Sequence, residues 1–98
     1  MGIITINQTV EFSHWLKNIK DKPTRQILAR RLERIAATGN FGDTKPIGND
    51  IYELREHKSP GWRIYYTYEA TNGMRLLWGG TKGSQSKDIL KAKKLADI

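Results

Sequence analysis

Residues 51–68 read IYELREHKSPGWRIYYTY, and the pattern of this segment is the basis on which we infer the fold. Large apolar side chains recur at every second position on both sides of the segment Lys58–Gly61, whose Pro-Gly dipeptide suits the two central positions of a turn. This period of two predicts two antiparallel strands joined by that turn. Leu54 then pairs with Ile64, and both side chains face the core.

A third strand is expected after a second turn, Thr71–Gly73. We expect a three-residue loop that closes with Gly73 in the left-handed conformation, because a two-residue turn would put the apolar partners on opposite faces. Gly79 and Gly80 then end the strand. The expected pairs are Tyr68 with Leu76 and Tyr66 with Trp78.

The residues before the hairpin predict one strand followed by two helices. Ile3–Ile6 is a β-branched run typical of a strand, and Asn7–Thr9 offers side chains that cap a helix. Pro23 fits the first turn of the second helix, and Gly39 fits its end. Apolar residues at helical spacing form a stripe on each helix, namely Phe12, Trp15, Leu16 and Ile19 on the first and Leu28, Leu32 and Ile35 on the second.

The rest of the chain completes one α+β domain over residues 1–98. Residues 39–50 are rich in turn formers and are expected to be an irregular connection. Ser84–Asp88 opens a short C-terminal helix. We therefore expect an N-terminal strand and a two-helix hairpin packed on a small, mainly antiparallel twisted sheet, followed by that helix. The basic edge of the last helix carries Lys87, Lys91 and Lys94.

The composition favours a soluble protein that binds polyanions. Seventeen Lys and Arg residues against ten Asp and Glu residues give a net charge of +7, shared as +3 over residues 1–50 and +4 over residues 51–98. A charge of this size also serves solubility alone. No apolar stretch approaches the roughly 18 residues of a membrane span, and the first residues lack the basic region of a signal peptide. We expect a cytoplasmic protein without a membrane partner.

Neither a metal site nor a cofactor site is expected. The chain has no cysteine, which excludes disulfides, thiolate zinc sites and a cysteine nucleophile. His14 and His57 stand in no spacing that marks a metal site. Residues 79–83 lack the full spacing of a phosphate-binding loop.

The functional site is expected on the face of the hairpin that carries the odd-numbered residues. Side chains alternate along a strand, so Arg55 and Arg63 stand directly opposite each other on this face. Two guanidinium groups so close repel, and an anion between them relieves the repulsion. Lys82 can join them, His57 offers an imidazole suited to acid–base chemistry, and Tyr65 can stack on a nucleobase. We expect Arg63 to be exposed on a rigid strand. The alternative is that Arg55 and Arg63 are both solvated residues of the sheet.

Six runs carry a family resemblance, in order and at compatible spacing from Phe12 to Ala96. They are Phe12-x-x-Trp15-Leu16, Arg30-Arg-Leu-x-Arg34, Gly39-Asn-Phe-Gly-Asp-x-Lys-Pro-x-Gly48, Tyr52-Glu-Leu-Arg55, Gly61-Trp-Arg63-Ile-Tyr65-Tyr66 and Gly79-Gly-x-Lys82-x-x-Gln85-x-x-Asp88-Ile89. Together they resemble the RelE/ParE/HigB toxin superfamily, and most of all its phage-associated branch, the addiction module killer proteins.

The resemblance implies a RelE-like fold and the toxin of a type II toxin–antitoxin system. The expected activity is that of an mRNA interferase, a metal-independent endoribonuclease that cuts mRNA on the ribosome and arrests translation. The expected partners are mRNA on the ribosome and a cognate antitoxin of helix-turn-helix type, with operator DNA bound only through the antitoxin. Two other classes stay open, a ParE-like poison of DNA gyrase and a non-catalytic nucleic-acid-binding prophage module.

The resemblance also implies roles for single residues. Arg63 matches the family's arginine that clamps the scissile phosphate, and Arg55 and Lys82 match further charge-stabilising positions. His57 is our candidate general acid or base. No Tyr or His follows Lys82, whereas some family members place one beside the cleaved phosphate. The residues expected to bind nucleic acid are Tyr65, Lys58, Lys87, Lys91 and Lys94.

Overall fold

The computed structural model describes residues 3–97, which form helices and strands in the order strand, two helices, four strands and a final helix. The last strand leads through a short 3₁₀ turn, η1, into the final helix. The elements are β1 (Ile6–Gln8), α1 (Val10–Lys17), α2 (Lys22–Thr38), β2 (Thr44–Gly48), β3 (Ile51–Glu56), β4 (Trp62–Glu69), β5 (Gly73–Thr81), η1 (Lys82–Ser84) and α3 (Gln85–Ala96).

The five strands form one mixed sheet in the order β1-β5-β4-β3-β2. The β1 strand pairs with β5 in parallel, and every other neighbouring pair is antiparallel. The expected α+β class and the mainly antiparallel sheet are therefore confirmed. No helix within the described residues 3–97 is long and apolar enough to cross a membrane.

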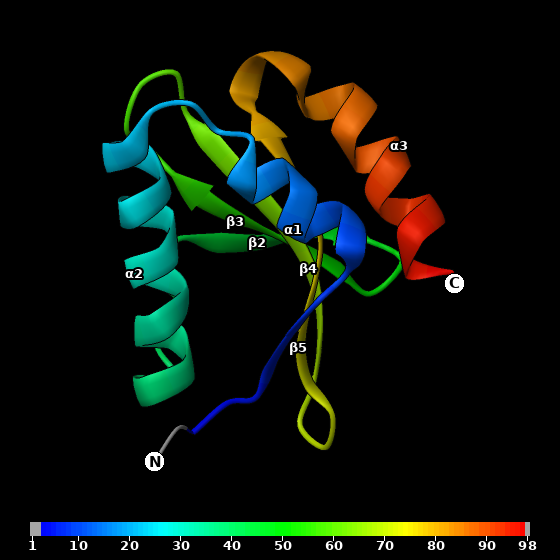
Figure 1. The fold of residues 1–98 in the computed structure, drawn as a ribbon. Coiled ribbons are helices and arrows are strands. Elements are labelled where there is room, and N and C mark those ends of the chain that lie inside the picture. The colour runs from blue at the N-terminus through cyan, green and yellow to red at the C-terminus, as the bar shows by residue number, and fades with distance from the viewer. Residues whose placement is uncertain (1–2, 98) are drawn as a thin grey trace.

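Helices cover both faces of the sheet (Figure 1). Residues of α1 and α2 share one apolar core with one face of the sheet, in which Phe12 and Ile35 are fully buried. On the other face, α3 packs Ala92 and Leu95 against the sheet. Because both faces are covered, side chains on the α3 face are less exposed than a bare sheet would leave them.

The ends of the two N-terminal helices follow the sequence. Thr9 caps α1, and its hydroxyl accepts a hydrogen bond from the Phe12 amide at 3.0 Å. Pro23 lies in the first turn of α2, and Gly39 ends that helix with a φ of +74°. The predicted strand at Ile3–Ile6 is displaced to Ile6–Gln8. The amides of Ile3 and Ile4 donate instead to the Ala36 carbonyl near the end of α2.

The expected irregular connection over residues 39–50 contains a strand, β2, and that prediction is wrong. β2 pairs with β3, with Thr44 opposite Leu54. Proline and glycine within β2 hide it in the sequence, but β2 is the outermost strand of the sheet. An edge strand tolerates a proline because one side of its backbone needs no hydrogen-bond partner from the sheet.

The β3–β4 register is as predicted, with Leu54 opposite Ile64 and Arg55 opposite Arg63. The predicted turn centre is wrong. The Gly61 amide donates to the Lys58 carbonyl at 2.7 Å, so Ser59 and Pro60 occupy the central positions.

The predicted β4–β5 register is also wrong, although Gly73 has the expected positive φ of +82°. Glu69 pairs with Gly73, so the chain reverses earlier than expected. The observed pairs are Tyr68 with Met74, Tyr66 with Leu76 and Tyr65 with Trp78, and the register shifts between Tyr65 and Tyr66. This shift moves Trp78 from the expected core to the α3 face, where it packs with Tyr65 and Leu77.

Candidate anion-binding site

A cavity of about 450 Å³ lies where β3, β4 and the start of α3 meet. All four residues predicted to be catalytic, Arg55, His57, Arg63 and Lys82, line it. Lys45 of β2 and Gln85 of α3 line it as well, and sequence reasoning missed both. The cavity therefore brings together residues as far apart in the chain as Lys45 and Lys82, which are 37 positions apart.

The two arginines reach the cavity from neighbouring strands. Arg55 on β3 and Arg63 on β4 are register partners, as the sequence predicts. Four cationic side chains, Lys45, Arg55, Arg63 and Lys82, line the cavity, and its lining includes no carboxylate among the residues that the structure describes. An anion such as a phosphate is the ligand that this charge favours.

Arg63 is buried, which corrects the expectation that it is exposed. It is 4% exposed, because α3 and its preceding turn cover this face of β4. Its Nη1 donates to the Trp62 carbonyl at 3.0 Å. Its Nε lies 3.7 Å from Oε1 of Glu53, whose exposure is 0%. A buried carboxylate therefore lies against the guanidinium on the side away from solvent.

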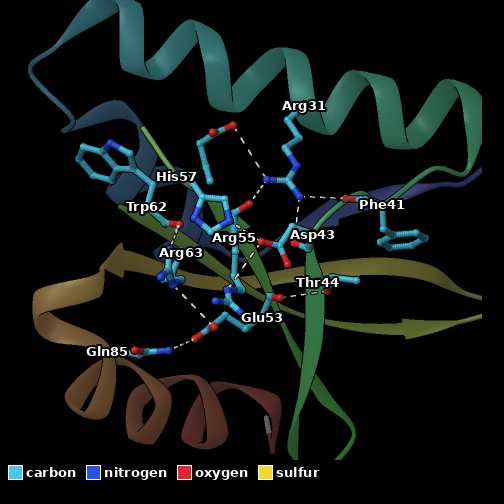
Figure 2. A network of polar contacts seen from close by, with 11 residues as sticks. Arg31, Phe41, Asp43, Thr44, Glu53, Arg55, His57, Trp62, Arg63 and Gln85 are labelled. Atoms are coloured by element: carbon cyan, nitrogen blue, oxygen red, sulfur yellow. Dashed lines mark hydrogen bonds and ion pairs between the residues drawn. The ribbon is translucent and has the colours of Figure 1, made fainter. Parts of the chain in front are cut away.

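Glu53 is held in turn by the C-terminal helix. The Gln85 side-chain amide donates to Oε2 of Glu53 at 2.6 Å. Figure 2 shows Gln85, Glu53 and Arg63 in a row, with Gln85 contributed by α3 and the other two by the sheet. Strand alternation was the signal for Glu53, since it puts this carboxylate on the same face as Arg55 and Arg63.

Tyr65 is fully buried, so the prediction that its ring stacks on a nucleobase is wrong. It belongs to the core beneath α3, packed with Ile51, Leu77 and Leu95. Burial raises the pKa of its hydroxyl above the usual value, and the nearby Glu53 carboxylate raises it further. The sequence placed Tyr65 on the correct face but did not show that α3 covers that face.

His57 stands at the exposed rim of the cavity and bonds through Nε2 to the Asp43 carboxylate. This hydrogen bond lowers the pKa of Asp43, and the guanidinium of Arg55, 3.8 Å away, lowers it further. Since Asp43 occupies Nε2, the other ring nitrogen, Nδ1, is left for a ligand. Asp43 was missed because it falls in the segment predicted to be an irregular loop.

Arg31 of α2 fixes the backbone that carries Asp43. Its guanidinium donates to the carbonyls of Phe41 and Asp43, both at 3.0 Å, and to the carbonyl of Arg55. Figure 2 shows Arg31 reaching these carbonyls from the helix. Burial lowers the pKa of Arg31, and the Glu56 carboxylate at 4.0 Å opposes this shift. One half-buried side chain thus holds the loop and the end of β3 in register.

Gly79 lets α1 approach β5 closely, and Gly80 lets α3 do so through Asp88. A Cβ on Gly79 would lie 2.3 Å from the Trp15 ring, and one on Gly80 would lie 1.8 Å from Oδ2 of Asp88. Asp88 accepts a hydrogen bond from Nε1 of Trp78 at 3.0 Å and another from Ser84. These contacts fix the start of α3 and hence the turn that carries Lys82 into the cavity.

The structure does not bring the other predicted nucleic-acid contacts into the cavity. Lys58 lies 3.7 Å from the Asp21 carboxylate, on the far side of its turn. Lys91 lies 4.0 Å from the centre of the Trp78 ring, in a separate groove between α1 and α3. Lys87 and Lys94 are exposed on α3 outside the cavity. Within residues 3–97, no three His, Cys, Asp or Glu side chains gather as metal ligands would.

Comparisons with known proteins give a sequence relative and a fold. No family model matches the sequence. A protein of Haemophilus influenzae, described as uncharacterized, is 38% identical over 93 residues, which span 95% of this chain and 93% of that protein. The solved structure of a mutant of the E. coli toxin RelE in the free state superposes with a TM-score of 0.74 at 17% identity. It covers 96% of this chain and 97% of the RelE chain, so the RelE-like fold implied by the resemblance is confirmed.

Proposed function

We propose that this chain, which belongs to one protein family with its Haemophilus influenzae relative and has the fold of RelE, is the toxin of a type II toxin–antitoxin system. Its proposed activity is ribosome-dependent cleavage of mRNA without a metal ion. The observation that carries this proposal is the cavity of about 450 Å³ that gathers Arg55, His57, Arg63 and Lys82.

The reaction uses the substrate's own 2′-hydroxyl as the nucleophile. Its oxygen attacks the adjacent phosphorus and the bond to the 5′-oxygen breaks. The leaving 5′-oxygen takes a proton from water, so that a 2′,3′-cyclic phosphate and a 5′-hydroxyl result. Negative charge grows on the phosphate oxygens, and preformed cations stabilise that charge. Arg63 and Arg55 bind the phosphate from adjacent strands, and Lys82 adds a third positive charge from η1.

His57 is the proposed proton-transfer group. A neutral imidazole that donates Nε2–H to Asp43 presents the lone pair of Nδ1, which suits it to accept the proton of the 2′-hydroxyl. Asp43 also stabilises the imidazolium that this transfer forms, by the hydrogen bond and by its charge. His57 is mostly exposed, so a substrate at the rim reaches it.

The proposed partners are those that the resemblance to the toxin superfamily implies, and the charge of the chain supports them. A domain of net charge +7 whose cavity holds four cations attracts RNA and also an acidic segment of a partner protein. The proposed partner protein is the cognate antitoxin of helix-turn-helix type, and operator DNA is bound only through it. Co-expression with the product of the adjacent gene should give a complex that survives dilution and weakens with salt.

Expression without the antitoxin tests the proposed activity. We expect growth arrest together with new 5′-hydroxyl ends on mRNA recovered from translating ribosomes, and no cleavage of the same RNA free in solution. Arrest with intact mRNA and damaged DNA would instead identify a gyrase poison. Salt-sensitive nucleic-acid binding without arrest would identify a non-catalytic module. The matched variants are Lys82→Ala, which removes a positive charge from the cavity lining, and Lys94→Ala, which removes a positive charge outside the cavity.

A further inference from the structure

Two opposite charges are buried beneath the cavity. Glu53 is 0% exposed and Arg63 is 4% exposed. Oε1 of Glu53 and Nε of Arg63 face each other at 3.7 Å, and neither atom has a hydrogen-bond partner within the described structure. The desolvation of two buried charges costs more free energy than their attraction supplies when they lie 3.7 Å apart without a hydrogen bond. The pair is therefore poorly explained as a source of stability.

The second oxygen of Glu53 is tightly held. Gln85, 32 residues away in the sequence, donates to Oε2 at 2.6 Å, and Gln85 also lines the cavity. The carboxylate is thus fixed from the α3 side, and it presents its free oxygen to the arginine. The contacts form a chain that begins on α3 and ends at the guanidinium facing the anion site.

We propose that Glu53 and Gln85 are positioning residues that hold the Arg63 guanidinium in the orientation that the phosphate requires. This inference rests on the proposed function for its substrate. Because Glu53 is fully buried and lies behind Arg63, it acts through that side chain and does not touch RNA. Gln85 acts one step further back, by fixing the carboxylate. Groups held this way keep their geometry while charge develops on the substrate, so little energy is spent on reorganisation.

Removing the charge of Glu53 separates positioning from simple electrostatics, because the two predict opposite changes in kcat. Glu53→Gln makes the site more positive, so electrostatics alone predicts tighter RNA binding and unchanged or faster cleavage. Positioning predicts a lower kcat, because a misplacement of about 1 Å costs on the order of 10²-fold in rate. KM should stay level or fall. The matched control is Glu56→Gln, which removes the same charge from the same strand, where Glu56 faces Arg31.

The experiment measures kcat and KM on ribosome-bound mRNA for wild type, Glu53→Gln, Gln85→Met and Glu56→Gln. We expect kcat to fall about 10²-fold in Glu53→Gln and less in Gln85→Met, with Glu56→Gln at the wild-type rate. The double variant Glu53→Gln/Gln85→Met should be no slower than Glu53→Gln alone, since Gln85 works only through the carboxylate. Wild-type kcat in folded Glu53→Gln, or a raised KM with unchanged kcat, would overturn the inference.

Hydrogen exchange of the Arg63 Nε–H, followed by NMR on the free protein, tests the positioning without RNA. We expect exchange to be faster in Glu53→Gln and Gln85→Met than in wild type and Glu56→Gln, because the guanidinium loses its fixed partner. An unchanged exchange rate in both variants would contradict the proposal that Glu53 and Gln85 position Arg63. Faster exchange in a chain whose wild type never cleaves RNA would support the positioning and overturn the proposed nuclease. Gln85→Met keeps this test open if Glu53→Gln does not fold, because Gln85 is only half-buried.

Discussion

At the scale of single residues, the site depends on pairs whose partners are not interchangeable. Arg63 faces the buried Glu53, and His57 faces the half-exposed Asp43. The first pair is shielded from solvent by α3, and the second lies at the rim of the cavity. Removing one member of the buried pair should affect stability strongly, and removing one member of the exposed pair should affect it weakly.

Arg63→Ala should destabilise the protein by about 3–5 kcal/mol, because it leaves the Glu53 carboxylate buried without a counter-charge. Cleavage should be lost as well. Adding Glu53→Gln should restore much of the stability and none of the activity, since the second change removes the orphaned charge. Urea unfolding of the two variants, with cleavage assayed in parallel, checks both statements. An Arg63→Ala protein as stable as wild type would contradict the idea that this variant leaves a buried carboxylate without a counter-charge.

Asp43→Asn should change how stability depends on pH. The folded pKa of Asp43 lies below its usual value of 3.8, so the carboxylate contributes stability that is fully present above that value and is lost as the pH falls through the lowered folded pKa. Wild type should therefore exceed Asp43→Asn in stability at neutral pH, and the two should converge in strong acid. Urea midpoints measured across the acid range report this. A constant gap at every pH would contradict the assigned cause.

At the scale of elements, α3 and its preceding turn determine the shape of the site. They cover Tyr65 and Arg63, and they supply Lys82 and Gln85. The helix is held by Asp88, whose carboxylate occupies the space that the missing side chain of Gly80 leaves on β5. A change that pushes Asp88 outward should therefore reach the cavity through the helix.

Gly80→Ala should destabilise the protein by about 1–3 kcal/mol and reduce cleavage, since a methyl group would overlap the Asp88 carboxylate at 1.8 Å. Thermal unfolding and the cleavage rate measure the two effects. Gly83→Ala is the matched control, because its nearest neighbour, Oγ1 of Thr81, lies 3.7 Å from the added carbon. If both variants have the same Tm, the close approach of β5 and α3 does not require a glycine at position 80.

In the whole molecule, the excess positive charge is unevenly distributed. The cavity gathers Lys45, Arg55, Arg63 and Lys82, whereas Lys58 is engaged by Asp21. In the proposed complex with RNA, charge that lines the cavity would contact substrate phosphates directly and release their counterions. Charge elsewhere contributes only to the general attraction, which salt screens.

Lys82→Ala should lower the slope of log affinity against log salt by roughly 0.7, the value for one phosphate contact to single-stranded nucleic acid. Lys58→Ala should leave the slope near that of wild type, because this lysine faces a carboxylate of its own chain. Fluorescence titration of a labelled oligoribonucleotide at several salt concentrations gives the slopes. Equal changes in both variants would mean that RNA is bound by diffuse charge and not by the cavity.

Features that depend on neighbouring residues could be predicted from the sequence. Alternation along β3 and β4 set Arg55 opposite Arg63, and the residues at Thr9, Pro23 and Gly39 marked the ends of the helices. These features follow from strand and helix periodicity and from backbone conformation, and both act over a few residues. The pairing of Arg55 with Arg63 follows from this local register, whereas the place of Lys82 follows from the docking of α3.

Which element covers each face of the sheet could not be predicted from local patterns. The edge strand β2, the shifted β4–β5 register and the burial of Tyr65 each depend on a partner element that no local pattern specifies. The contact of Gln85 with Glu53 likewise joins α3 to β3 across 32 residues. Strand periodicity says which side chains share a face, and the packing of a distant helix determines whether that face meets water, substrate or core.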